Sequence, residues 1–200
     1  MELTHFNEEG RARMVDVSVK EPTLRIARAA ATVHMLPATM EKIRADTMKK
    51  GDVLAVAQVA GILAAKETAD LIPMYHNIFL TGTDIRFELL ESELHIFSEV
   101  RCKGETGVEM EALTAVSTAA LTVYDMCKAV QRDMTITDIR LLYKEGGKSS
   151  VFEREGSMAE VTAVNISEKK ACASMRCPIS TCFPTTASSA TRTRETGTGR

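Results

Sequence analysis

Alternating apolar and polar positions along the chain predict four β-strands. The segment 25–35, RIARAAATVHM, ends shortly before a proline and is the first of them. The runs 77–90 and 93–102 show rough period-two alternation in IRFELL and LHIFSEV, and the turn-like ESE at their junction indicates a hairpin. The segment 135–143, TITDIRLLY, is the last strand.

Three segments carry the signals of helices. Pro37 begins the first, over 37–48, where its missing N–H would be unpaired anyway. The second is the apolar run 53–70, with Asp52 as its N-cap. The third and longest covers 108–133, VEMEALTAVSTAALTVYDMCKAVQRD. Together with the strands, these helices give the order β-α-α-β-β-α-β. This order predicts an α+β, ferredoxin-like sandwich with an antiparallel sheet packed with helices.

The amino-acid composition changes the expected core. The chain has 200 residues, 44% of them hydrophobic and 26% charged, so it is long and apolar enough to bury an interior. Only 4% are aromatic and none is Trp, so Ala, Val, Leu, Ile and the eleven Met must fill that interior. A formal charge of −2 argues against a nucleic-acid partner, because such binding usually needs a net basic face.

The chain shows no signal for export or for a membrane. Its first residues, MELTHFNEEGRAR, are polar and carry acids, unlike a signal or transit peptide. The longest apolar stretch, 53–65, is shorter than the roughly 20 residues that cross a bilayer. We therefore expect a cytoplasmic protein with reduced cysteines. The tail cysteines repeat every fifth residue, which does not match the CxxC spacing of zinc sites, so we expect no metal there. They are Cys172, Cys177 and Cys182.

Asp125 and Lys128 are candidates for acid/base chemistry. They lie three residues apart in the longest predicted helix, so they share a face and are able to pair. One interpretation is a solvent-exposed ion pair without function. The other rests on the apolar surroundings, TVYDMCKAV, because a buried Lys beside a carboxylate is how proteins prepare an acid/base couple. Both interpretations remain open at this point.

Glu109 and Glu111 lie at the other end of the same helix, where the macrodipole favours carboxylates and explains them without function. Glu111 and Asp125 are fourteen residues apart, about 21 Å along a helix, which is too far for one small substrate to bridge. A site that contains both is more easily assembled from two chains. His76 lies in LIPMYHNIF, a loop where functional residues are common, although a hydrogen-bonded turn also explains it.

Lys148 belongs to the loop KEGGKSS, whose end resembles a P-loop. The motif GxxxxGK[ST] requires glycine where this chain has Leu142, so the match fails. A flexible glycine pair that presents a lysine is still suited to a phosphate. Surface solvation explains each other basic candidate singly, whereas several at one site would hold a polyphosphate. These candidates are Lys49, Lys50, Lys66, Arg25 and Arg28.

Four longer blocks follow one another along the chain: LTHFNEEGRARMVDVS, KGDVLAVAQVAGILAAKETADLIPMYHN, TGVEMEALTAVSTAALTVYDMCKAVQRD and RLLYKEGGKS. Together they resemble the MoaC family, the cyclic pyranopterin monophosphate synthases of molybdenum-cofactor biosynthesis, over roughly residues 1–155. GVEMEALTA and YDMCKA are the most specific motifs. The resemblance implies a ferredoxin-like protomer in a homohexamer, a trimer of dimers with active sites at the dimer interface.

The resemblance also implies an activity and its residues. Enzymes of this family are lyases that convert 3′,8-cyclo-7,8-dihydro-GTP to cyclic pyranopterin monophosphate and release pyrophosphate. Asp125 matches the general acid or base and Lys128 its partner. No metal or cofactor is required, and Mg²⁺ is a candidate companion of the triphosphate. The implied substrate contacts are Met74, Tyr75, His76, Met110, Glu111 and Glu109, and the implied triphosphate ligands are Lys50, Lys66, Arg25 and Lys148.

The chain departs from the family pattern at Tyr75. The family usually has Cys-His-Pro or Cys-His-Asn where this chain has Tyr75-His76-Asn77. Tyr is much bulkier than Cys, so we expect the fit of the substrate to differ at this position. The alternative function is therefore a catalytically degenerate oligomer that binds a nucleotide or pterin without turnover.

The C-terminal residues predict a separate segment. MAEVTAVNISEKK, within 156–170, resembles the first strand of a MOSC domain, whereas 171–200 is rich in Thr, Ser and Ala and predicts disorder. An alternative reading frame of MRCPISTCFP can spell the MOSC-like AMPHIDLLP. We hypothesise a reading-frame change near residue 170, which sequencing of the gene would test. A sulfur-transfer protein is a third functional hypothesis, based on this segment alone.

Overall fold

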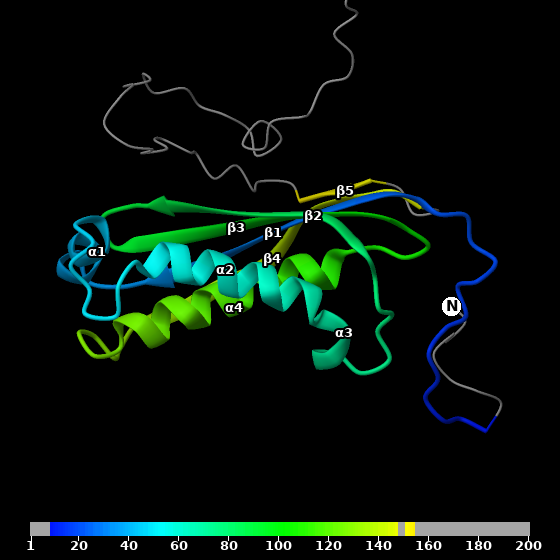
Figure 1. Ribbon diagram of the computed structural model, residues 1–200, viewed down its shortest axis with the longest axis horizontal. Coiled ribbons are helices and arrows are strands. Elements are labelled where there is room, and N and C mark those ends of the chain that lie inside the picture. Colours follow the sequence, from blue (N-terminus) through cyan, green and yellow to red (C-terminus); the bar gives the residue numbers. More distant parts are fainter. Residues whose placement is uncertain (1–8, 148–150, 155–200) are drawn as a thin grey trace, which may run out of the picture. The chain divides into compact units, whose positions relative to one another are not determined.

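One sheet forms a layer of the protein, and helices cover one of its faces (Figure 1). A computed structural model describes residues 9–147 and 151–154, all of them within one compact unit. Every neighbouring pair of strands is antiparallel. The strands are β1 (Thr23–His34), β2 (Leu80–Leu89), β3 (Glu93–Gly104), β4 (Thr135–Glu145) and β5 (Phe152–Glu153), and their order in the sheet is β2-β3-β1-β4-β5.

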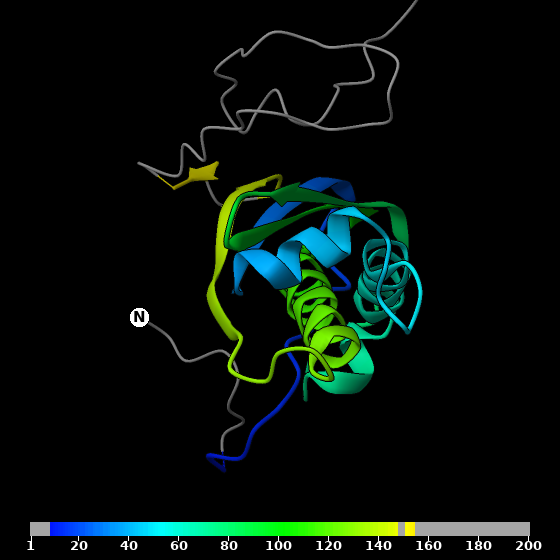
Figure 2. The ribbon, with the colours of Figure 1, turned by 90° about the vertical axis from the view of Figure 1, so that its left-hand side faces the viewer.

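The two long helices lie side by side on the same face of the sheet, as the turned view shows (Figure 2). The order β2-β3-β1-β4, with α2 and α4 as the crossover helices, is that of a ferredoxin-like split βαβ fold. The predicted α+β class and antiparallel sheet are therefore confirmed. The helices are α1 (Pro37–Arg44), α2 (Val53–Lys66), α3 (Thr68–Leu71) and α4 (Glu109–Cys127).

Small side chains bring α4 close to the sheet. Ala27, Ala29 and Ala31 on β1 are fully buried, as are Ala115 and Ala119 on α4. Methyl groups on both sides of an interface allow backbones to approach, and the remaining space is filled by buried Val, Ile, Leu and Met. The core predicted from the scarcity of aromatic residues is confirmed among the described residues.

The second predicted helix is divided in two. Asp52 caps α2 as expected, because its Oδ1 accepts a hydrogen bond of 2.9 Å from the Ala55 N–H. The helix ends at Lys66 rather than at residue 70. Thr68 Oγ1 donates to the carbonyls of both Ala64 and Ala65, 3.1 Å from each. Such side-chain hydrogen bonds compete with the helical ladder, and a short helix, α3, follows the break.

The longest predicted helix ends earlier than residue 133. Lys128 is the C-cap of α4, and the chain beyond it turns so that Gln131 reaches the start of α1. Gln131 Oε1 accepts hydrogen bonds from the Leu36 N–H, at 2.8 Å, and from Thr39 Oγ1, at 2.9 Å. These contacts satisfy a donor at the N-terminus of α1, which has no side-chain cap of its own. A tertiary contact is therefore associated with the early end of α4.

The opposite face of the sheet carries a buried ion pair. Arg28 Nε lies 2.6 Å from Glu99 Oε2, and Glu99 also pairs with Arg101. The Arg28 guanidinium stacks over the Tyr143 ring, 4.9 Å from its centroid. Arg28 is thus engaged within the sheet, which makes it a poor member of the basic group considered for a polyphosphate.

Several sequence predictions concern other parts of the chain. Lys148, the MOSC-like segment 156–170 and the tail 171–200 all lie outside the described residues, so the predicted domain boundaries stay predictions. Within the described ranges, no helix combines the length and the apolar character that crossing a bilayer requires.

Candidate functional site

Asp125 lies between two lysines at the C-terminal end of α4. Lys128 Nζ is 2.6 Å from its Oδ1 and Lys50 Nζ is 2.7 Å from its Oδ2. Lys50 Nζ also donates to the Asp125 backbone carbonyl at 2.9 Å. Lys128 reaches Asp125 from the same helix, whereas Lys50 comes from the turn before α2. We call these three residues the aspartate end of the site.

The aspartate end is open to solvent in the single chain. The side chains of Asp125 and Lys128 are 55% and 52% exposed. The hydrogen bonds from Lys128 and Lys50 lower the pKa of Asp125 to about 2. In the single chain, Asp125 and Lys128 therefore form the exposed ion pair, which is the first of the two interpretations that the sequence left open. The buried couple is wrong for this state, because Val123, Met126 and Cys127 face the core while Asp125 faces outward.

Glu111 lies at the N-terminal end of α4 and, unlike Asp125, is buried. It is 2% exposed. The Tyr75 hydroxyl lies 2.8 Å from Glu111 Oε2 and, equally, 2.8 Å from the Gly107 carbonyl oxygen. Glu109 stands two residues earlier on the helix. Tyr75, Gly107, Glu109 and Glu111 form what we call the glutamate end of the site.

Burial dominates the electrostatics of the glutamate end. It raises the pKa of Glu111 to about 7, and the charge of Glu109 contributes in the same direction. Burial and the charge of Glu111 also raise the pKa of Tyr75 and bring that of the buried Cys102 thiol to about 11. A carboxyl with such a pKa exchanges its proton near neutral pH, which a solvated glutamate does not.

Lys144 is a charged residue of this end that no sequence motif indicated. Its Nζ lies 3.1 Å from Glu109 Oε1. Glu109 in turn folds over Gly107, where a Cβ would lie 1.9 Å from Glu109 Oε2. The sequence does offer a sign of Lys144, because this lysine shortly precedes the glycine pair Gly146-Gly147 that Lys148 follows.

The glycine pair itself packs on Arg25. A Cβ on Gly147 would lie 1.9 Å from Arg25 Nη1, and both Gly146 and Gly147 have positive φ, 98° and 82°. Arg25 is 8% exposed and donates to the carbonyls of Gly104 and Glu105, at 3.1 and 2.9 Å. The pair therefore shields a largely buried cation, as well as ending the strand.

The remaining predicted contacts lie around the glutamate end. His76 Nε2 donates to the Val15 carbonyl at 2.7 Å and so anchors the N-terminal arm. Met74, in the same loop, adopts a left-handed backbone with φ 62°, which is uncommon for a residue other than glycine. Met110 is half-buried on α4. Lys66 is exposed at the C-terminal end of α2. Because α2 runs antiparallel to α4, this end of α2 lies toward the glutamate end of the site.

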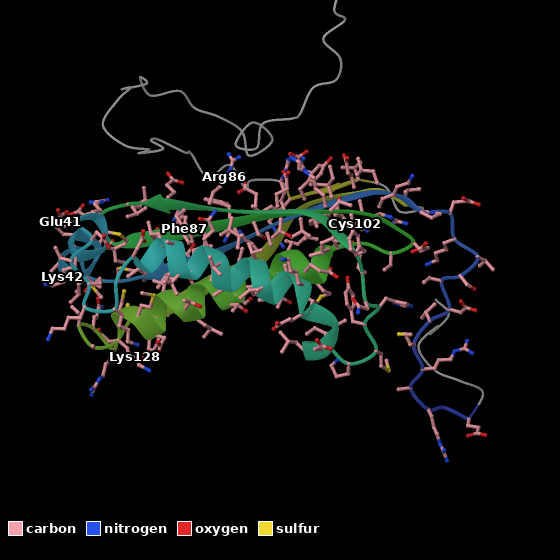
Figure 3. The ribbon with its side chains drawn as sticks, in the orientation of Figure 1. Glu41, Lys42, Arg86, Phe87, Cys102 and Lys128 are labelled. Atoms are coloured by element: carbon pink, nitrogen blue, oxygen red, sulfur yellow. The ribbon has the colours of Figure 1, made fainter. Side chains whose placement is uncertain are left out.

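The two ends of the site are far apart within one chain. Glu111 and Asp125 are both on α4, which is continuous from Glu109 to Cys127, so about 21 Å of helix separates them. Figure 3 shows Lys128, at the aspartate end, beside one end of the helices and Cys102, on β3 near the glutamate end, toward the other side of the picture. The structure thus brings the predicted residues into two clusters and does not join them.

Potential metal ligands are scattered among the described side chains. Among residues 9–147 and 151–154, no three His, Cys, Asp or Glu side chains are grouped so that they could hold a metal ion. The only two cysteines in these ranges, Cys102 and Cys127, are buried free thiols. The role of Mg²⁺ with a bound triphosphate stays a prediction.

A family model covers most of the described residues. The model of the MoaC family matches residues 14–147, about two thirds of the chain. The chain belongs to the MoaC family. The match includes every predicted MoaC site residue except Lys148, and it includes Lys144.

Curated MoaC relatives match over nearly their whole length. The protein named cyclic pyranopterin monophosphate synthase of Peptoclostridium acidaminophilum is 59% identical over 155 residues, which are 78% of this chain and 99% of the relative. The protein of the same name from Desulfitobacterium hafniense is 57% identical over 163 residues, 81% of this chain and 100% of the relative. That of Bacillus subtilis is 56% identical over 157 residues, 76% of this chain and 92% of the relative.

Proposed function

We propose that this protein is a cyclic pyranopterin monophosphate synthase in molybdenum-cofactor biosynthesis. It would act as a lyase that converts 3′,8-cyclo-7,8-dihydro-GTP to cyclic pyranopterin monophosphate with release of pyrophosphate. The observation that carries the proposal is that the chain spans 99 to 100% of two relatives with this name at 57 to 59% identity. Likeness at that level over the relatives' whole length favours a shared activity.

The aspartate end supplies a carboxylate and two cations. Opening the purine imidazole ring and closing the pyranopterin require proton transfers, and departure of pyrophosphate requires positive charge. In the free chain Asp125 is a weak base, because Lys128 and Lys50 hold its pKa at about 2. A bound triphosphate would compete for both lysines. In that case Asp125 regains proton affinity when the substrate is in place, which makes it the acid or base and Lys128 its partner.

The glutamate end supplies contacts for the rest of the substrate. Glu111, Met110 and the block of Met74, Tyr75 and His76 lie on α4 and on the loop before β2. Nearby positive charge comes from Arg25 and Lys66, and Lys148 is added from the resemblance alone. These residues would hold the nucleotide and the triphosphate beside the acid/base pair of the aspartate end.

One complete site requires both ends, and we propose that two chains supply them. The separation of about 21 Å along α4 is too long for one substrate. The helical layer also exposes large apolar side chains, and such patches mark protein interfaces. They include Val56, Val59, Leu63 and Leu121. A dimer that places the aspartate end of one chain beside the glutamate end of its partner would complete the site, and three dimers would give the expected homohexamer.

Turnover by the purified protein tests the proposal. Incubation with 3′,8-cyclo-7,8-dihydro-GTP should yield cyclic pyranopterin monophosphate and pyrophosphate in equal amounts. Asp125→Asn and Lys128→Ala should each abolish turnover while the oligomer stays intact by size-exclusion chromatography. Asp133→Asn, at an exposed position shortly after the same helix, is the matched control and should keep full activity. Bound substrate without product would instead support the degenerate binding protein, and activity in either site variant would refute the assigned roles.

A further inference from the structure

The Tyr75 hydroxyl at the glutamate end lies within hydrogen-bond distance of two acceptors, although it has only one proton to donate. A phenol carries one proton, yet the Tyr75 oxygen lies 2.8 Å from both Glu111 Oε2 and the Gly107 carbonyl oxygen. A carbonyl only accepts. Two full hydrogen bonds exist together only if Glu111 carries a proton and donates it to Tyr75, while Tyr75 donates to Gly107; otherwise one proton is shared between two acceptors. If Glu111 is ionised, the Tyr75 proton turns to the carboxylate and the bond to Gly107 is lost.

The surroundings make this proton count matter. Glu111 is 2% exposed, and its carboxyl group has hydrogen bonds with the Tyr75 hydroxyl and with its own backbone N–H. An ionised carboxylate in such a place needs a donor, and Tyr75 is the side chain that provides one. Glu109, by contrast, has Lys144 as its cation at 3.1 Å. In the first turn of α4, Glu109 is thus paired with a lysine, whereas Glu111 is paired with the hydroxyl of a tyrosine.

We propose that Tyr75 is a positioning residue that allows Glu111 to hold and release a proton inside a dry site. Its hydroxyl accepts from the neutral acid while donating to Gly107, and it turns to donate to the carboxylate once the proton has left. The proton goes to the bound substrate, or to water in the free protein, and no electrons are transferred. The use of this proton in the reaction rests on the proposed function, whereas its presence on Glu111 does not.

The groups that face Glu111 favour the neutral form. Burial acts first, and the negative charge of Glu109 adds to it. Hydrogen bonds from the backbone N–H of Glu111 itself and from the Tyr75 hydroxyl oppose both by stabilising the ionised form. Removal of that hydroxyl should therefore strengthen proton binding, and the transfer from Glu111 should become harder. The other titratable groups around this end are Cys102 and Glu105 from β3 and the residues after it, Arg25 from β1 and Lys144 from β4.

Infrared spectroscopy of the substrate-free protein tests the proton directly. At neutral pH the wild type should show a carboxylic-acid C=O band that is missing in Glu111→Gln, with a titration midpoint near 7. In Tyr75→Phe, which keeps the ring, the midpoint should move upward by about one pH unit, because the ionised form loses its charge-assisted donor. An ionised Glu111 throughout the neutral range would overturn the proposal, and so would an unchanged midpoint. The comparison with Glu111→Gln stands even if Tyr75→Phe does not fold.

Steady-state kinetics tests what the proton does. In Tyr75→Phe, kcat should fall roughly tenfold with little change in KM, and the limb of the pH profile that reports Glu111 should move to higher pH. Tyr143→Phe is the matched control, since Tyr143 also bonds a glutamate, Glu145, but on the other face of the sheet. Its profile should not move. A titrating band without any product would refute the proposed function alone, whereas product formation without the band would refute the role of Tyr75 alone.

Discussion

Gly61 lies on α2 where this helix packs against α4 and β2. A Cβ built at this position would be 2.9 Å from the Ala115 backbone oxygen and 2.3 Å from Ile85 Cδ1. The Ile85 methyl is the end of a side chain and is able to turn, although Ile85 is 3% exposed and has little free space around it. The carbonyl belongs to the backbone of α4, so it moves only if the helix moves. Gly61→Ala should therefore push α2 and α4 apart.

Two effects of opposite sign decide the magnitude. Alanine in a helix interior is favoured over glycine by about 1 kcal/mol. Overpacking of a filled core costs about 1–3 kcal/mol, and the upper part of this range applies because one of the two short contacts is with backbone. The free energy of unfolding should therefore fall by about 1–2 kcal/mol. Because Lys50 precedes α2 and pairs with Asp125 on α4, the same displacement should also weaken the aspartate end.

Urea unfolding at one fixed protein concentration measures this effect, since an oligomer makes the apparent stability depend on concentration. Gly82→Ala is the matched control, because a Cβ at Gly82 would meet nothing within 4 Å. The control should stay within about 0.5 kcal/mol of the wild type. If Gly61→Ala proved as stable as the wild type or more so, the close approach of α2 and α4 would not limit stability and the reasoning would be refuted.

Two further predictions concern the ends of the site. In Lys50→Ala, the pKa of the Asp125 carboxyl should rise above about 2, because one of its two lysine donors is gone. Carbon-13 NMR of the carboxyl measures the titration midpoint. An unchanged midpoint would contradict the pairing of Lys50 with Asp125. His76→Ala removes the donor to the Val15 carbonyl, so trypsin should cleave the N-terminal arm several-fold faster. His95→Ala, on β3, is its control, and equal rates would show that His76 does not anchor the arm.

Local signals in the sequence predicted the elements and most of their ends. Pro37 begins α1, Asp52 caps α2, and the period-two runs are strands in an antiparallel hairpin. These features depend on neighbours a few residues away, which a sequence displays directly. All three predicted helices were too long, since α1 ends at Arg44, α2 at Lys66 and α4 at Cys127. The ends of α2 and α4 depend on a threonine that bonds back to the preceding turn and on a glutamine that reaches another helix.

The candidate site divides in the same way. Asp125 and Lys128 share a helix face by spacing alone, and the separation of Glu111 from Asp125 follows from the rise of a helix. The sequence by itself therefore determined the family, the fold class and the two-ended site. Only the tertiary structure decided which groups are buried, because burial depends on residues distant in the chain. Folding placed Lys50 on an exposed Asp125, Lys144 on Glu109, and the Tyr75 hydroxyl between Gly107 and a buried Glu111.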